Sequence, residues 1–305
     1  MIATTEYERL RETVGLVDRS ERGKFLLNGA EVAEFLQGQV TNDVEALEPG
    51  TGCYAALLDH KAKIRADMRV LRGTDWFWLD CEAIGHAALA HTIKMYSLGR
   101  DVHSRDVTEE RAILSLIGPA AREALDVAPP DGEHSFVEGE HGIYVAAHLG
   151  VDVICPADQA DGVREALGIE PVSEEAAECL RIESGRPRHG LDMGGQTIPQ
   201  EAGLNDRAVS FEKGCYVGQE TVARLHYKGK PNRFLRGLRL TAEAEHGAPI
   251  TFGDREVGTI GSTCVSPAHG PIALALIRRE AQPGATVTVG EGIEAEVVEL
   301  PFEAP

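Results

Sequence analysis

Two stretches of the sequence share one local pattern, an apolar strand that ends at a glycine and leads into a helix. The first strand and turn occupy residues 25–29, and a helix is predicted at 30–39 because Val32, Phe35, Leu36 and Val40 recur at helical spacing. The second strand and turn occupy residues 114–118 and lead to a helix predicted at 122–126. This weak repeat indicates two similar units, although a chance match of a few positions competes with it. The mixture of strands, hairpins and helices predicts an α+β fold with antiparallel sheets.

From residue 231 the helical spacing disappears and short strands alternate with Gly, Pro and Asp turns. The predicted strands are 233–240, 250–252, 256–262, 272–277 and 285–289. Strands of this length and spacing predict a small all-β domain, either a sandwich or a barrel. We therefore expect two domains, 1–230 and 231–305, with the boundary at Pro231-Asn232.

The formal net charge of −19 argues against general nucleic-acid binding, because proteins that contact phosphate backbones widely are more often basic. The first 20 residues show neither a signal-peptide core nor a transit pattern, and no run of about 18 apolar residues occurs. The six cysteines are scattered and form no CxxC pair, which indicates reduced thiols rather than a disulfide framework or a structural zinc site. We expect a cytoplasmic protein without a membrane segment.

One cysteine has an unusual setting. Cys215 lies between Gly214 and Gly218, just before a short helix predicted from residue 219. Glycine suits a sharp turn or a close backbone approach. A helix N-terminus and the nearby Lys213 would both favour thiolate over thiol. The sequence therefore indicates a reactive thiol, with a packed core cysteine as the alternative.

The sign of the charge inverts around this cysteine. Between residues 213 and 239 there are seven basic residues and one acidic residue, Glu220. The basic residues are Lys213, Arg224, Lys228, Lys230, Arg233, Arg236 and Arg239. Such a basic island predicts an attractor for an anionic ligand, carboxylate or phosphate. A solvated interdomain linker is the alternative.

Two carboxylates also lie in informative places. Glu183 is at the end of a helix predicted at 173–185, beside Gly185, and could accept paired N–H bonds from a planar heterocycle. The alternative is a surface glutamate paired with Arg181 or Arg186. Asp67 lies on an otherwise alternating strand, where a solvent-facing acid is the alternative to a functional one.

The run KGCYVGQE at residues 213–220, with Arg224 beyond it, resembles the signature of the YgfZ family. These are tetrahydrofolate-binding accessory proteins of iron–sulfur cluster maintenance, related in fold to the glycine-cleavage T-protein, an aminomethyltransferase. Further blocks that resemble this family are residues 36–44, 59–63, 181–185, 198–200, 257–260 and 272–275. Within them, Ala62 stands where the family usually has glycine.

The resemblance implies two α+β lobes with antiparallel sheets around a folate cavity, plus a C-terminal β-barrel. It implies tetrahydrofolate or a one-carbon derivative as cofactor, with Glu183 as the anchor of the pterin, since a carboxylate suits paired N–H donors. Arg224 would attract the glutamate tail. The predicted folate-binding residues are Glu183, Arg224, Tyr216, Gln219 and Gln200, and the predicted catalytic residues are Cys215, Lys213 and Asp67.

The implied partners are iron–sulfur recipient or assembly proteins. One cysteine cannot hold a cluster, which usually needs about four ligands. No stably bound metal is therefore expected, and Cys215 would act as a redox-active or transiently ligating thiol.

The sequence departs from the T-protein in two respects. T-proteins carry an acidic pair on the strand that corresponds to 61–70, but here only the second acid of Ala66-Asp67 is present. T-proteins also lack the cysteine motif. Both departures favour an accessory protein for assembly or repair of iron–sulfur clusters over an aminomethyltransferase. Two alternatives stay open, a folate-dependent aminomethyl or methyl transferase that uses Asp67, and a scaffold protein in which Cys215 is structural.

Overall fold

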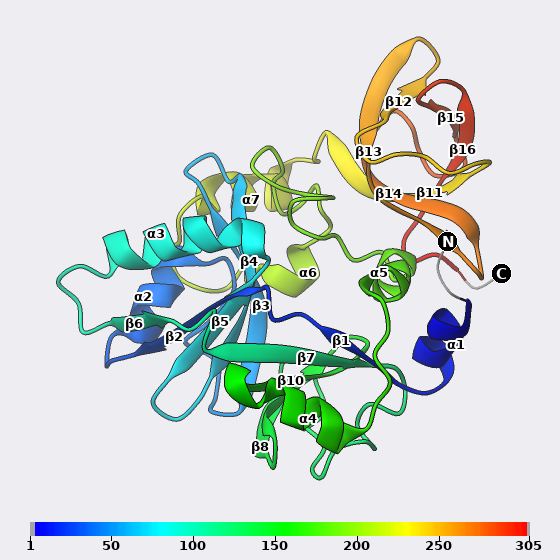
Figure 1. Ribbon diagram of the computed structural model, residues 1–305. Helices are drawn as coiled ribbons and strands as arrows, with labels where there is room; N and C mark the ends of the chain where they lie inside the picture. The colour runs from blue at the N-terminus through cyan, green and yellow to red at the C-terminus, as the bar shows by residue number, and fades with distance from the viewer. Residues whose placement is uncertain (1–3, 304–305) are drawn as a thin grey trace. The chain divides into compact units, whose positions relative to one another are not determined.

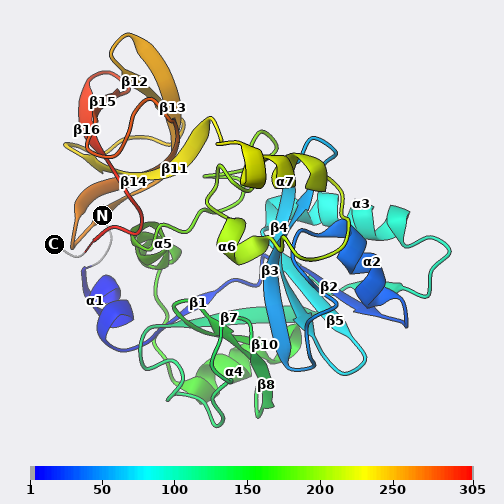
Figure 2. The same cartoon turned by 180° about the vertical axis from the view of Figure 1, so that it is seen from behind.

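The computed structural model describes residues 4–303, which divide into two compact units (Figures 1 and 2). The two-sheet unit comprises Glu8–Val172 and Asp206–Gln219. The barrel unit comprises residues 4–7, Ser173–Asn205 and 220–303. The predicted domain boundary between residues 230 and 231 falls within the barrel unit and stays a prediction.

The first antiparallel sheet of the two-sheet unit has the order β3-β4-β5-β2-β6. Its strands are β2 (Gly23–Asn28), β3 (Thr51–Leu58), β4 (Ile64–Arg72), β5 (Phe77–Cys81) and β6 (His103–Asp106). The apolar faces of α2 (Val32–Gln39) and α3 (His86–Tyr96) pack on this sheet, and a 3-10 turn, η1 (Ala83–Gly85), precedes α3. Phe35 of α2 and Leu89 of α3 are buried with Met68 of β4 in one core.

The second sheet of this unit is also antiparallel and has the order β1-β7-β10-β9-β8. Its strands are β1 (Gly15–Asp18), β7 (Arg111–Ile117), β8 (Phe136–Gly139), β9 (Gly142–Ala147) and β10 (Gly150–Pro156). After η2 (Ala157–Gln159), α4 (Ala160–Leu167) packs Val163 against this sheet. Two antiparallel sheets with their own helices confirm the predicted α+β class.

A buried ion network joins the two sheets. Arg69 of β4 donates to Asp80 of β5 at 2.7 Å and to Asp152 of β10 at 2.6 Å. Arg22 also donates to Asp80, at 3.0 Å, as does Trp78 at 2.9 Å. Burial alone would raise the pKa of Asp80, but the guanidinium groups of Arg69 and Arg22 outweigh it and lower that pKa to about 2.

The internal repeat is visible in the backbone at its two glycines. Gly29 and Gly118 have φ of +126° and +130°, and a Cβ would lie 2.2 Å from the carbonyl oxygen of Asp101 or 2.3 Å from that of Thr13. Both turns therefore require glycine. The helix predicted at 122–126 is wrong, because residues 119–124 form turns. A helix of so few residues gains little for its costly first turn.

The barrel unit contains a closed barrel of the order β11-β14-β13-β12-β15-β16, which decides between the predicted sandwich and barrel. Its strands are β11 (Arg233–Leu240), β12 (Pro249–Phe252), β13 (Arg255–Ser266), β14 (Gly270–Arg278), β15 (Thr286–Val289) and β16 (Ile293–Val298). The remaining helices of residues 4–303 are α1 (Thr4–Glu12), α5 (Glu174–Glu183), α6 (Asn205–Ala208) and α7 (Gln219–Lys228). No helix among the described residues is long and apolar enough to cross a membrane.

Helix α5 occupies Glu174–Glu183, within the predicted range 173–185. The Ser173 side chain accepts a hydrogen bond from the Ala176 backbone N–H at 3.4 Å, so Ser173 is the N-cap. Near its other end, Ile182 packs with Ile272 of β14 and Leu235 of β11. Packing on the barrel therefore fixes the position of Glu183, the last residue of the helix.

Candidate functional site

Cys215 is exposed and lies in the loop between α6 and α7, four residues before α7 begins. The other five cysteines are buried or partly buried. The position before a helix N-terminus is the predicted one, and exposure excludes the alternative of a packed core cysteine.

Lys213 anchors this loop. Its side chain is 8% exposed, and Nζ donates to the backbone carbonyls of Gln37, Val40 and Asn42 at 2.6, 2.7 and 3.0 Å. These carbonyls belong to the C-terminal end of α2 and the residues that follow, where a helix leaves acceptors without partners. Nζ also lies 5.1 Å from the centre of the Tyr216 ring. Burial lowers the pKa of Lys213 to about 8.

Gly218 fixes the other side of the loop. Its φ is +86°, and a Cβ would lie 2.7 Å from the carbonyl oxygen of Asp59 and 3.1 Å from Cα of Ala62. Gly214 has no atom within 4 Å of such a Cβ, so only the second glycine is sterically required. The hairpin between β3 and β4 thus holds the loop at Gly218, while α2 holds it at Lys213.

The same hairpin contains Ala62, which stands where the YgfZ family usually has glycine. Its φ is +62°, a left-handed conformation that glycine adopts without cost. Asp59 supports the turn, because its Oδ1 accepts hydrogen bonds from the backbone N–H groups of Lys61 and Lys63 at 2.8 and 2.9 Å. Alanine is therefore held in the conformation for which the family usually provides glycine.

Tyr216 and Gln219 close the loop on itself. The Gln219 backbone N–H donates to the Tyr216 carbonyl at 3.2 Å, and its side-chain amide donates to the Gly214 carbonyl at 3.5 Å. Burial raises the pKa of Tyr216 to about 12, so its phenol is neutral. These contacts order the cysteine loop, and the predicted folate-binding roles of both residues stay predictions.

Asp67 is 8% exposed on β4, so it is not a solvent-facing acid. The Tyr54 hydroxyl, from the neighbouring strand β3, donates to Asp67 Oδ2 at 2.5 Å. The guanidinium of Arg207 lies 4.9 Å from the centre of the Tyr54 ring. Burial and the adjacent Asp67 raise the pKa of Tyr54 well above its usual value, so Tyr54 remains a hydrogen-bond donor. The sequence did not predict either Tyr54 or Arg207 at this carboxylate.

Glu183 is also 8% exposed, and its Oε1 is a point where donors converge. Oε1 accepts from the Tyr7 hydroxyl at 2.8 Å, the Ser266 hydroxyl at 2.5 Å and the Cys179 thiol at 3.6 Å. Glu183 is therefore not the surface glutamate of the alternative.

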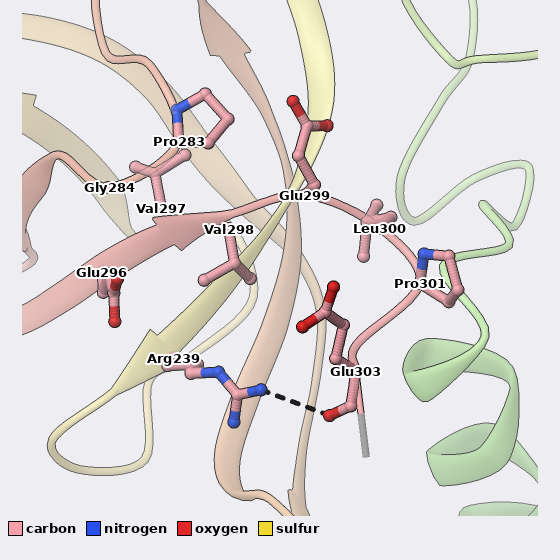
Figure 3. A pocket seen from close by; sticks show the side chains of 10 residues that line it. All are labelled: Arg239, Pro283, Gly284, Glu296, Val297, Val298, Glu299, Leu300, Pro301 and Glu303. Atoms are coloured by element: carbon pink, nitrogen blue, oxygen red, sulfur yellow. Dashed lines mark hydrogen bonds between the residues drawn. The ribbon is translucent and has the colours of Figure 1, made fainter. Parts of the chain in front are cut away.

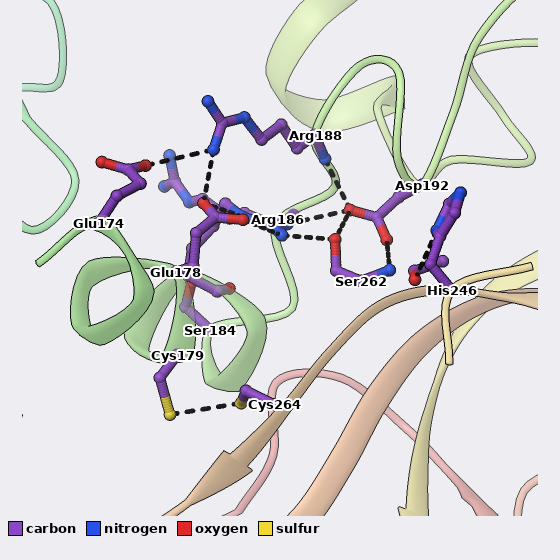
Figure 4. A network of polar contacts seen from close by, with 12 residues as sticks. Glu174, Glu178, Cys179, Ser184, Arg186, Arg188, Asp192, His246, Ser262 and Cys264 are labelled. Atoms are coloured by element: carbon purple, nitrogen blue, oxygen red, sulfur yellow. Dashed lines mark hydrogen bonds and ion pairs between the residues drawn. The ribbon is translucent and has the colours of Figure 1, made fainter. Parts of the chain in front are cut away.

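Arg181 belongs to a different network, whose members Glu178, Asp192 and Ser262 are labelled in Figure 4. It donates to Asp192 at 3.0 Å and to the Ser262 hydroxyl of β13 at 2.6 Å, and Asp192 accepts from the Ser262 backbone N–H at 2.7 Å. An ion pair of 2.8 Å with Glu178 holds the guanidinium on α5. This network ties α5 to β13 and supports the helix end that carries Glu183.

Gln200 has a buried side chain in the barrel unit. Its Nε2 donates to the Val222 carbonyl of α7 at 3.0 Å. Its Oε1 is buried without a hydrogen-bond partner among residues 4–303. A buried acceptor of this kind suits an N–H donor of a ligand, since leaving it unsatisfied costs about 1–3 kcal/mol.

The predicted basic island is not a uniform cationic surface. Arg233 pairs with Glu201 at 2.8 Å, and Arg236 pairs with Glu299 at 2.7 Å. Arg224 is exposed on α7, where it can meet an anion in solvent. The β11 arginines are thus largely neutralised by local acids, and the predicted attraction of a glutamate tail rests on Arg224.

The barrel has a cavity of about 500 Å³, which Figure 3 shows. Glu296, Glu299 and Glu303 line it, and Arg239 is the cation among its lining residues. This surplus of carboxylates disfavours an anionic folate tail. Within residues 4–303, no three His, Cys, Asp or Glu side chains are arranged to hold a metal ion.

Two family profiles match the chain. The profile of the GCVT N-terminal domain matches residues 1–138. The profile of the glycine cleavage T-protein C-terminal barrel domain matches residues 233–303, which contain all six barrel strands.

Relatives and a solved structure agree with these profiles. A chloroplastic protein of Arabidopsis thaliana, named only as a transferase, is 30% identical over 95% of this chain and 72% of its own length. A protein of Halobacterium salinarum named "Probable aminomethyltransferase" is 30% identical over 97% of this chain and 89% of its own length. The crystal structure of the glycine cleavage system aminomethyltransferase T from Bartonella henselae superposes with a TM-score of 0.89 at 25% identity, covering 98% of this chain and 89% of that one.

Proposed function

Because the chain belongs to the aminomethyltransferase-like family of the glycine-cleavage T-protein, we propose that it is a folate-dependent transferase of an aminomethyl or methyl group. The observation that carries the proposal is the buried Asp67 carboxylate, held by the Tyr54 hydroxyl at 2.5 Å. A carboxylate that is buried on a sheet strand and held by a tyrosine hydroxyl is typical of a functional acid rather than of a surface residue.

Each residue has a distinct proposed task. Asp67 stabilises positive charge at the reacting amine nitrogen, and Tyr54 holds the carboxylate in one orientation. Tetrahydrofolate supplies the nitrogen atoms that accept the one-carbon unit. Ala66 stands where the T-protein has the first acid of its pair, so proton movement falls to Asp67 alone.

The barrel unit offers acceptors that fit a pterin. We assign Glu183 to its N–H donors, because a buried carboxylate forms strong charge-assisted hydrogen bonds. Tyr7 and Ser266 hold the Glu183 carboxylate in place. The buried Gln200 Oε1, without a partner among residues 4–303, adds a neutral acceptor for the same kind of donor. Arg224, exposed on α7, is assigned to the carboxylates of the glutamate tail.

A transfer assay tests the proposal. Purified protein is mixed with an aminomethyl-lipoyl carrier protein, and ammonia release is followed with and without tetrahydrofolate. We expect folate-dependent release that Asp67→Asn lowers by about 100-fold, the range of general acid–base contributions. Asp75→Asn, an exposed acid of the same sheet region, is the matched control and should retain full activity. If wild type releases no ammonia above the folate-free rate, aminomethyl transfer is excluded.

The exposed Cys215 favours a second candidate, the role of a tetrahydrofolate-binding accessory protein in iron–sulfur cluster assembly or repair. Lys213 and Gly218 hold its loop at two points, which suits a thiol presented to a partner protein. The test is the activity of iron–sulfur enzymes in oxidatively stressed cells that carry Cys215→Ala, with Cys53→Ala as control. A loss only in the Cys215 variant supports this role, and unchanged activity rejects it.

A further inference from the structure

Two cysteines far apart in the sequence meet in the barrel unit (Figure 4). The Cys264 thiol of β13 lies 3.3 Å from the sulfur atom of Cys179 of α5, and it donates its hydrogen to that sulfur. Cys179 is buried, whereas Cys264 is partly exposed. The pair therefore joins a thiol that can meet a small oxidant to one that is shielded from it.

The pair continues into a hydrogen-bond chain. Cys179 donates to Glu183 Oε1 at 3.6 Å, so the two thiols and the carboxylate lie in a row. The hydrogen bond with Cys264 and burial both raise the pKa of Cys179. A thiol of this kind is unreactive toward an oxidant in solution, but it attacks an activated sulfur at contact distance when a base accepts its proton.

We propose that Cys179 and Cys264 are a redox-active dithiol that hydrogen peroxide converts into an intramolecular disulfide. This inference does not rest on the proposed folate chemistry, although both involve Glu183. It also differs from any reaction of Cys215, which belongs to the two-sheet unit.

The reaction proceeds in two balanced steps. The Cys264 sulfur attacks one oxygen of the peroxide, the O–O bond breaks, and the thiol proton joins the leaving hydroxide to give water and a Cys264 sulfenic acid. The Cys179 sulfur then attacks the Cys264 sulfur, and the S–O bond breaks as the S–S bond forms. Glu183 accepts the Cys179 proton and passes it to the leaving hydroxide, giving a second water. Two thiols are oxidised, and one peroxide is reduced by two electrons.

The surroundings favour closure of the pair. The sulfurs need to approach by about 1.3 Å, from 3.3 Å to the roughly 2.05 Å of a disulfide. The network of Arg181, Asp192 and Ser262 already holds α5 against β13, so the two backbones are kept in register during the reaction. Oxidation removes the thiol donor from Glu183, while the donors Tyr7 and Ser266 remain.

Peptide mapping tests the proposal on the full chain. Cys215→Ser protein, which lacks the exposed thiol, is treated with one equivalent of hydrogen peroxide, alkylated under denaturing conditions and digested with trypsin. We expect peptides 165–181 and 256–278, each with a single cysteine, to appear as one cross-linked species that a reductant separates. The buried Cys155 of β10 should remain an alkylatable thiol and serves as the internal control.

Two variants distinguish the roles of the two sulfur atoms. Cys264→Ser should leave Cys179 reduced, whereas Cys179→Ser should trap Cys264 as sulfenic or sulfinic acid. The proposal is overturned if the two peptides stay fully alkylated in the Cys215→Ser protein. It is equally overturned if Cys179 is oxidised at the same rate when Cys264 is serine.

Discussion

Replacing Lys213 by methionine should destabilise the protein by about 3 kcal/mol. Three charge-assisted hydrogen bonds, to carbonyls at 2.6–3.0 Å, contribute roughly 6 kcal/mol at about 2 kcal/mol each. The lowering of the Lys213 pKa from 10.5 to about 8 corresponds to a burial cost of about 3 kcal/mol for the charge. Methionine keeps most of the side-chain volume, so the expected net loss is the difference between these two contributions, about 3 kcal/mol.

Thermal and denaturant unfolding measure this effect. At about 2 °C per kcal/mol for a chain of this size, the Tm of Lys213→Met should fall by about 6 °C. Hydrogen exchange of the amides at 210–218 should accelerate at the same time, because the loop loses its anchor. Lys228→Met, at the exposed end of α7, is the matched control. An unchanged Tm together with unchanged exchange in the loop would refute the anchoring role of Lys213.

The pH dependence gives an independent check. The folded-state pKa of Lys213, about 8, is below the value of 10.5 for an ordinary lysine, so the folded protein releases the proton first as pH rises. Between these values the unfolded chain binds more protons, and this group makes stability rise with pH. Lys213→Met should lack that rise between pH 8 and 10.5. Equal slopes in wild type and variant would contradict the shifted pKa.

Three further substitutions test other parts of the fold by denaturant unfolding. Gly218→Ala should cost at least about 3 kcal/mol through its positive φ and the 2.7 Å approach to a backbone oxygen, while Gly214→Ala stays within about 0.5 kcal/mol. Asp80→Asn should cost about 3–5 kcal/mol, because the buried Arg69 and the partly buried Arg22 lose their shared carboxylate. Because folding lowers the pKa of Asp80, wild type should lose about 2 kcal/mol of its free energy of unfolding as pH falls from 3.8 to about 2. Asp80→Asn should show no such loss from this group. Ala62→Gly should stabilise by about 0.5 kcal/mol by relieving a left-handed alanine, and a destabilisation above 1 kcal/mol would contradict the strain at φ +62°.

Local patterns predicted much of the fold. The alternating strands, the helix predicted at 173–185 and the helix that follows Cys215 were all visible in the sequence, because each depends on neighbouring residues. The strand β16 was missed although its pattern is regular, with Ala295 and Val297 facing the core between exposed glutamates. The acidic composition of that segment concealed an ordinary half-buried strand.

The partners of the candidate site residues were less predictable. Tyr7 reaches Glu183 across 176 positions of sequence, and Lys213 reaches the carbonyl of Gln37 across the same separation. Such contacts depend on tertiary packing, which no local pattern specifies. The sequence did contain a weak indication of Tyr54. Tyr54 and Asp67 lie on the two strands that flank residues 59–63, and such neighbouring strands commonly pair.

Binding of tetrahydrofolate tests the central claim most directly. Calorimetric titration of wild type should show saturable, one-to-one binding, and Glu183→Gln should weaken it by at least about 10-fold, equivalent to about 1.4 kcal/mol. Glu175→Gln, an exposed glutamate of the same helix, should bind as wild type does. Absence of saturable binding by wild type would contradict a folate-dependent function. Equal affinity of the Glu183→Gln protein would contradict the assignment of Glu183 to the pterin.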